Sequence, residues 1–149
     1  MDSLIYTDEL LMKEALKQAE MALQEDEVPI GAVIADSKGR IISRGHNMTE
    51  RLNDPTAHAE MIALTGAFEA MGGKYLNDCT LCVTVEPCPM CAAAMAWAQV
   101  GKLVYGCDDP KRGYSRFSPS LLHPKTEIVK GICSEEASSL MKNFFASKR

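Results

Sequence analysis

Hydrophobic and polar positions along this chain follow two periods, one typical of amphipathic helices and one typical of short buried strands. Behind Thr7, which we expect to cap a helix, apolar residues recur every three or four positions as far as Leu23. Two later apolar runs, 30–35 and 40–43, are joined by a short polar turn that contains glycine. Their lengths and the turn between them predict a β-hairpin.

The rest of the chain continues this alternation. Helices are predicted at about 57–70, 87–100 and 135–145, and strands at 80–85, 102–106 and 126–129. The polar loops 45–56 and 107–125 are expected on the surface, where binding groups concentrate. The order of the elements predicts an α/β fold, a three-layer α-β-α sandwich with a central mixed five-stranded sheet. We interpret residues 1–149 as a single domain, because this length and 46% hydrophobic content suit one core.

Composition and charge narrow the class of protein. No apolar stretch approaches the roughly 20 residues that span a bilayer, and no signal peptide is evident, so we expect no membrane partner and a cytoplasmic location. Six cysteines in a reducing compartment are more often free, catalytic or metal-bound than paired. Residues 1–100 carry 7 basic and 15 acidic side chains, whereas residues 101–149 carry 9 and 5. An anionic partner would therefore meet the C-terminal third, although an unevenly charged solvated face explains the same counts.

A histidine and two cysteines stand where two predicted helices begin. His58 opens the helix at 57–70, and Cys88 and Cys91 lie in the first turn of the helix at 87–100. Three such ligands leave the fourth position of a zinc ion to water, as in catalytic zinc sites. The partial positive charge of a helix N-terminus favours thiolate over thiol. We therefore predict one Zn²⁺ per chain, held by these three side chains.

Glu60 follows His58 by two residues, about 200° further round a helix, which disfavours both as ligands of one ion. A carboxylate in the first turn of that helix can instead reach a water on the metal. Zinc lowers the pKa of its water towards about 7, and the carboxylate takes the proton, so that hydroxide attacks a nearby electrophilic carbon. We interpret Glu60 as a proton shuttle.

A second Cys-x-x-Cys pair, Cys79 and Cys82, lies at and within a predicted strand. Residues three apart on a strand point to opposite faces, so we do not expect this pair to chelate an ion. Cys82, Cys107 and Cys133 are interpreted as small buried hydrophobic residues.

The pattern His-x-Glu followed by Pro-Cys-x-x-Cys resembles the signature of the zinc-dependent deaminases of the cytidine deaminase fold. Within that family the chain resembles bacterial tRNA-specific adenosine deaminases over nearly its full length. The matching segments are EVPIGAV at 27–33, DPTAHAEMIAL at 54–64, VTVEPCPMCA at 83–92, and VYG at 104–106 followed by DPKRG at 109–113. The resemblance implies conversion of adenosine to inosine at the wobble position of a tRNA anticodon loop, carried out by a homodimer.

The resemblance also implies roles for individual residues. It implies zinc on the same histidine and cysteines, and attack at C6 of adenine with Glu60 delivering protons to N1 and to the leaving ammonia. The residues implied at the base are Asn47, Ala59 through its backbone, and Val28, Pro29 and Ile30 in the pocket wall.

The segment 113–127 is shorter than, and unlike, the Gly-Ser and Asn-His-Arg elements of many tRNA deaminases. Residues 111–117, which overlap the start of this segment, combine cations with interleaved aromatic rings. This combination suits single-stranded RNA. The predicted RNA contacts are Lys111, Arg112, Tyr114, Arg116 and Phe117. An ordinary exposed turn is the alternative interpretation.

Two other functions compete with this one. A free nucleobase or nucleotide deaminase, acting on guanine or cytosine, would use the same zinc chemistry, and Trp97 and the EPCPMC segment resemble those enzymes. Such enzymes typically have Gly-Pro-Phe-Gly-Ala where residues 28–32 are Val-Pro-Ile-Gly-Ala, which favours the tRNA enzymes. A non-catalytic zinc-stabilised RNA-binding domain is disfavoured by Glu60, because a structural site has no use for it. The apolar segment 92–100 offers an interface for dimerisation.

Overall fold

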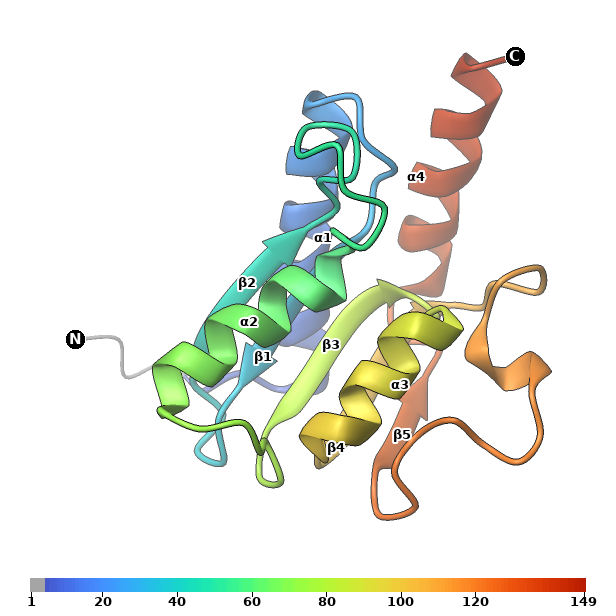
Figure 1. Cartoon of the computed structure of the whole chain (residues 1–149). Helices are drawn as coiled ribbons and strands as arrows, with labels where there is room; N and C mark the ends of the chain where they lie inside the picture. The colour runs from blue at the N-terminus through green and yellow to red at the C-terminus, as the bar shows by residue number, and fades with distance from the viewer. Residues whose placement is uncertain (1–4) are drawn as a thin grey trace.

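The computed structural model describes residues 5–149, which form a five-stranded sheet between two layers of helices (Figure 1). The elements in chain order are α1 (Asp8–Gln24), β1 (Gly31–Ala35), β2 (Ile41–His46), α2 (Ala59–Met71), β3 (Thr80–Val85), α3 (Pro89–Ala98), β4 (Lys102–Cys107), a 3₁₀ turn (Tyr114–Arg116), β5 (Glu127–Lys130) and α4 (Ser134–Ser147). The predicted α/β fold with a mixed five-stranded sheet is confirmed.

The strand order is β2-β1-β3-β4-β5, and β1 runs in the direction opposite to that of the other four strands. β1 is antiparallel to both β2 and β3, whereas β3, β4 and β5 are parallel. The carboxyl ends of β2, β3, β4 and β5 therefore lie at one edge of the sheet. Parallel neighbours need a long crossover, and β4 and β5 are joined by residues 108–126, whose only regular element is the 3₁₀ turn.

Side chains on the strands alternate between two buried layers, as the period of a strand requires. Ala32, Ile34 and Leu81 point into the core beneath α2 and α3, whereas Val33 and Cys82 point into the core beneath α1. In Figure 1 the same division appears as α2 and α3 on one side of the sheet and α1 on the other. Among residues 5–149, no helix combines the length and apolar character needed to cross a membrane.

Gly45 allows α2 to lie close to β2. A Cβ atom at this position would stand 2.6 Å from the carbonyl oxygen of Ala59 and 2.8 Å from the backbone nitrogen of Ala63. Because those neighbours are helix backbone, they cannot move aside as a flexible side chain would. The missing side chain therefore brings the first turn of α2, and the residue before it, against the end of β2.

Several predicted details differ from the structure. α2 begins at Ala59, so His58 is its N-cap and does not lie inside the helix, and α3 ends at Ala98. Cys107 and Cys133 are half-buried, so the prediction that they are buried is wrong. Cys79 and Cys82 do lie in different cores on opposite faces of the sheet, as predicted.

Candidate active site

Two helices begin next to each other at the carboxyl edge of the sheet (Figure 1). α2 follows β2 through the loop 47–58, and α3 follows β3 directly. His58 and Cys88 are the N-cap residues of these helices and both have extended backbone conformations. Open α/β sheets place their binding sites at this edge, beyond the carboxyl ends of the strands.

The three predicted ligands converge at this point. The Nδ1 atom of His58 lies 3.5 Å from the Sγ atom of Cys88 and 3.5 Å from that of Cys91. With Zn–S bonds of about 2.3 Å and Zn–N bonds of about 2.0–2.1 Å, a tetrahedral ion places nitrogen and sulfur about 3.5 Å apart. The two nitrogen–sulfur distances therefore fit edges of a zinc tetrahedron.

Protons within this group are shared unequally. A hydrogen bond from the Cys91 thiol lowers the pKa of Cys88 to about 4. The same contact raises the pKa of Cys91, which keeps its proton between the two sulfurs. A hydrogen bond with Cys88 also raises the pKa of His58. The group thus favours a thiolate, the form of cysteine that binds metal.

Glu60 lies in the first turn of α2 and is only 3% exposed. It does not belong to the group of donor atoms that converge within 4.8 Å of one another. Burial raises the pKa of its carboxyl to about 7, near the value at which a group both accepts and releases protons at neutral pH. The carboxyl therefore lies beside the three candidate donor atoms without being one of them, and its role as a proton shuttle stays a prediction.

The predicted base-binding residues lie around the same edge. Asn47 follows β2 and is 5% exposed, and its backbone N–H donates to the carbonyl oxygen of Ile30 at 3.1 Å. Gly31, the residue after Ile30, donates its N–H to the hydroxyl of Thr84, near the end of β3, at 3.2 Å. The wall segment 28–30 is thereby tied to both neighbouring strands. Sequence reasoning missed Thr84, which lies inside the matching segment 83–92.

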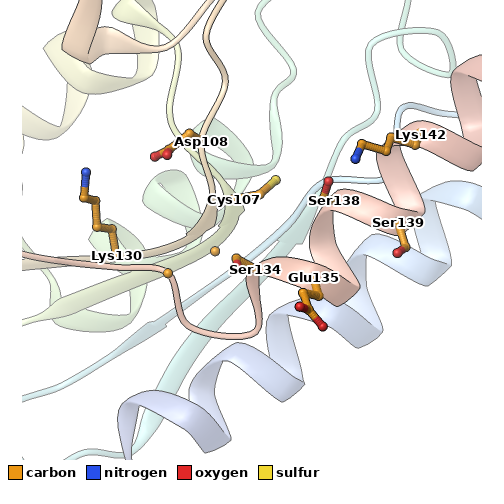
Figure 2. A pocket seen from close by; sticks show the side chains of 10 residues that line it. Cys107, Asp108, Lys130, Ser134, Glu135, Ser138, Ser139 and Lys142 are labelled. Carbon is orange, nitrogen blue, oxygen red and sulfur yellow. The ribbon is translucent and has the colours of Figure 1, made fainter.

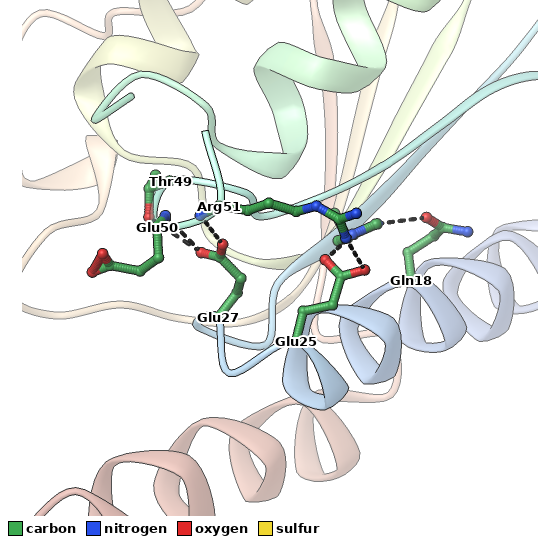
Figure 3. A network of polar contacts seen from close by, with 7 residues as sticks. Gln18, Glu25, Glu27, Thr49, Glu50 and Arg51 are labelled. Atoms are coloured by element: carbon green, nitrogen blue, oxygen red, sulfur yellow. Dashed lines mark hydrogen bonds and ion pairs between the residues drawn. The ribbon is translucent and has the colours of Figure 1, made fainter. Parts of the chain in front are cut away.

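Glu27 braces the loop that carries Asn47 (Figure 3). Its carboxylate is 1% exposed and accepts hydrogen bonds from the backbone N–H groups of Glu50 at 3.0 Å and Arg51 at 2.7 Å. Beside it, Glu25 pairs with Arg51 and with His46, the last residue of β2. Hydrogen bonds therefore fix the base of the predicted loop 45–56, whose first two residues belong to β2, and half of its residues are exposed.

The basic loop after β4 divides into exposed and buried parts. Lys111, Arg112, Arg116 and Phe117 are exposed, and the Arg116 guanidinium lies 5.8 Å from the centre of the Phe117 ring. Tyr114 is only 6% exposed and packs edge-on against Tyr105. The prediction that the Tyr114 ring is free to stack on a base is wrong, because the loop turns this side chain into the core.

A cavity of about 680 Å³ extends the same edge of the sheet beyond β4 (Figure 2). It opens between the residues that end β4 and the first turns of α4, and Lys130 and Lys142 are part of its lining. None of the residues of the metal group lines it. It is thus a neighbouring hollow with a partly basic rim, and the metal group lies outside it.

Comparisons with known proteins agree with this geometry. Residues 5–107 match the family model of the cytidine and deoxycytidylate deaminase zinc-binding region. A tRNA-specific adenosine deaminase of Bacillus subtilis (strain 168) is 44% identical over 147 residues, which cover 95% of this chain and 91% of that protein.

Solved structures of similar proteins point to the same family. A structure from work on A-to-I editing by tRNA:A34 deaminases matches with a TM-score of 0.81 and 40% identity over 87% of this chain and 97% of its own. A guanine deaminase of Bacillus subtilis matches with a TM-score of 0.65 and 37% identity over 69% of this chain and 66% of its own. The chain therefore belongs to the cytidine and deoxycytidylate deaminase family and, within it, to the tRNA-specific adenosine deaminases.

Proposed function

We propose that this chain is a zinc-dependent hydrolytic deaminase that converts adenosine to inosine at the wobble position of a tRNA anticodon. The observation that carries the proposal is the convergence of His58, Cys88 and Cys91 beside the buried Glu60. The Bacillus subtilis tRNA-specific adenosine deaminase, 44% identical, supports adenosine in tRNA as the substrate. We take residues 1–149 to act as one catalytic domain.

His58, Cys88 and Cys91 would hold the zinc ion and leave one position for water. When bound, zinc would act as a Lewis acid and lower the pKa of that water to about 7. Glu60 accepts a proton from the attacking water and delivers it to N1 of adenine as oxygen bonds to C6. Glu60 then passes the second water proton to the amino group, which leaves as ammonia, and the carbonyl of inosine remains. A carboxyl pKa raised by burial suits this double transfer.

The base would be recognised beside this centre. We assign the Asn47 amide and the Ala59 backbone to hydrogen bonds with the base, and Val28, Pro29 and Ile30 to the wall of the pocket. The hydrogen bond from Asn47 to Ile30 supports this grouping, because it holds the amide residue next to the wall segment. Glu27 supports it from behind by fixing the loop that follows Asn47.

The RNA backbone would meet the exposed part of the basic loop. Lys111, Arg112 and Arg116 supply cations, and Phe117 supplies a ring on which a base of the anticodon loop stacks. Transfer RNA as substrate, together with six cysteines that form no disulfide, supports the cytoplasm as the place where the enzyme acts.

A homodimer would cover an apolar surface on α2 and α3. Trp97 is 84% exposed and lines a hollow of about 400 Å³ together with Met61, Phe68 and Tyr75. Such a large exposed indole beside other apolar side chains is typical of interaction surfaces. Trp97 lies within the apolar segment 92–100, so the proposed interface agrees with the one expected from the sequence.

Incubation with a tRNA whose wobble base is adenosine should yield inosine and ammonia in equal amounts. Guanine, cytosine and free adenosine, tested in parallel, should react far more slowly, because they lack the RNA contacts. Glu60→Gln should abolish turnover while the protein keeps its zinc. Rapid turnover of a free base with no reaction of the tRNA would contradict the proposal and favour a nucleobase deaminase.

Zinc content should depend on one cysteine pair and not on the other. Cys91→Ala should lower bound zinc from about one ion per chain to near zero, because two ligands hold a zinc ion poorly. Cys79→Ala, which removes a thiol of the second Cys-x-x-Cys pair, should leave the metal in place. Metal analysis of the dialysed proteins checks both, and equal zinc loss in the two variants would contradict the assigned ligand set.

Replacement of Lys111, Arg112 and Arg116 by alanine should weaken tRNA binding and flatten its dependence on salt. Each lost phosphate contact should reduce the slope of log K against log salt by roughly one unit. The matched control replaces Lys13, Lys17 and Lys38, three exposed cations of α1 and the hairpin turn, and should leave the slope unchanged. Binding titrations at several salt concentrations make the comparison, and identical slopes for both triple variants would remove the loop from the RNA site.

Light scattering should report twice the chain mass of 16.3 kDa for the wild-type protein. Trp97→Glu should shift it to monomer, because a charge would be placed at the centre of the apolar surface. Met21→Glu, at an exposed methionine on α1, is the control and should remain dimeric. A monomeric wild-type protein, or a dimer that tolerates Trp97→Glu, would argue against this interface.

A further inference from the structure

Glu86 is a buried carboxylate for which the proposed chemistry has no use. It stands two residues before Cys88 and is 4% exposed. One of its oxygens accepts the backbone N–H of Asp109 at 3.0 Å, and the other accepts both the N–H and the hydroxyl of Ser115, at 3.0 Å and 2.6 Å. All of these partners belong to the loop between β4 and β5. The carboxylate thus joins the turn that carries Cys88 to a loop more than 20 residues away in sequence.

Further contacts tighten the same junction. The N–H of Tyr114 donates to the carbonyl oxygen of Pro87 at 2.9 Å, and the N–H of Glu86 donates to that of Cys107 at 2.9 Å. Gly113 packs so closely on the Glu86 carboxylate that a Cβ atom there would overlap its oxygens. The segment before Cys88 and the loop after β4 therefore form one packed unit.

The cations of the loop are built on this anchor. Asp109, whose N–H is held by Glu86, accepts the N–H groups of Lys111 at 3.2 Å and Arg112 at 3.1 Å through its own carboxylate. Arg116 follows Ser115 directly and donates its guanidinium to the carbonyl oxygen of Lys111. Within residues 5–149, none of these three cations forms an ion pair with an acidic side chain. They are held in place by backbone contacts, and their charges remain available to an anion.

We propose that Glu86 is a positioning residue that fixes the basic loop relative to the metal centre. The loop then binds the RNA backbone while the reacting base lies at the metal centre. The proposal rests on the proposed function, because it assigns the anion to the RNA substrate. A carboxylate suits this position because it accepts three hydrogen bonds and donates none. Glutamine would turn a donor group towards at least one of the backbone N–H groups.

Glu27 offers a matched comparison within the same protein. It is equally buried and also accepts two backbone N–H groups, but from the loop on the opposite side of the site. That loop follows Asn47 and lacks the three cations. Glu86→Gln and Glu27→Gln therefore make the same chemical change to two anchors, of which only the first supports the basic loop.

The test is a kinetic double-mutant cycle on tRNA deamination. Glu86→Gln should keep one zinc per chain and raise KM for tRNA by roughly tenfold or more, with kcat changed by less than about threefold. In a background where Lys111, Arg112 and Arg116 are alanine, the same substitution should change KM by less than about twofold, because the contacts it disturbs are already gone. Any change in KM caused by Glu27→Gln should be the same in that background as in the wild-type protein. Glu20→Gln, on the exposed face of α1, should have no effect in either.

Two further variants at the same contact test the proposal if Glu86→Gln unfolds the protein. Gly113→Ala displaces the carboxylate from the side of the loop, and Ser115→Ala removes a single hydroxyl; both should raise KM and lose this effect in the cation-free background. The positioning role is overturned if Glu86→Gln raises KM equally in the cation-free background, or if it lowers the zinc content. Absence of any tRNA turnover by the wild-type protein overturns the proposed function as well, whereas turnover with an additive cycle overturns the role of Glu86 alone.

Discussion

The meeting of two helix N-termini at one edge of the sheet is the constraint on which the rest of the site depends. β2, β3, β4 and β5 run in the same direction, so their carboxyl ends collect at that edge. Gly45 lets α2 approach β2, and the turn after β3 starts α3 beside it. His58 and Cys88 occupy the N-cap positions, where the backbone is extended and the side chains flank the ends of the helices. Neither helix alone supplies a metal site.

Three buried glutamates lie around this edge of the sheet, and their neighbours divide them into two kinds. Glu27 and Glu86 each face backbone N–H groups and so anchor a loop. At Glu60, burial outweighs the hydrogen bonds from its own backbone N–H and from the Cys91 thiol, and raises the pKa of the carboxyl to about 7. A carboxylate surrounded by backbone donors is a fixed acceptor, whereas one whose charge is poorly compensated exchanges protons easily.

The helices and strands were predicted well from the sequence because they depend on local features, and the convergence of the three candidate ligands could be predicted for the same reason. Apolar periodicity marks helices and strands, and His58, Cys88 and Cys91 stand next to helix starts that their own neighbours define. Glu27 and Glu86 were missed as anchors because their partners lie more than 20 residues away, and nothing in a local pattern identifies a distant amide. Tyr114 was misplaced for the same reason, since only the packed loop shows that its ring meets Tyr105. The match of 27–33 and 83–92 to a known family included both glutamates without indicating what they do.

X-ray absorption at the zinc K-edge of the purified protein tests the central claim most directly, because it reports the atoms around the metal. Convergence of the two helix starts predicts two sulfur atoms at about 2.3 Å and two nitrogen or oxygen atoms at about 2.0–2.1 Å. The sulfur shell should stay the same in Glu60→Gln. Four sulfur atoms, or fewer than two, would contradict a site built from His58, Cys88 and Cys91.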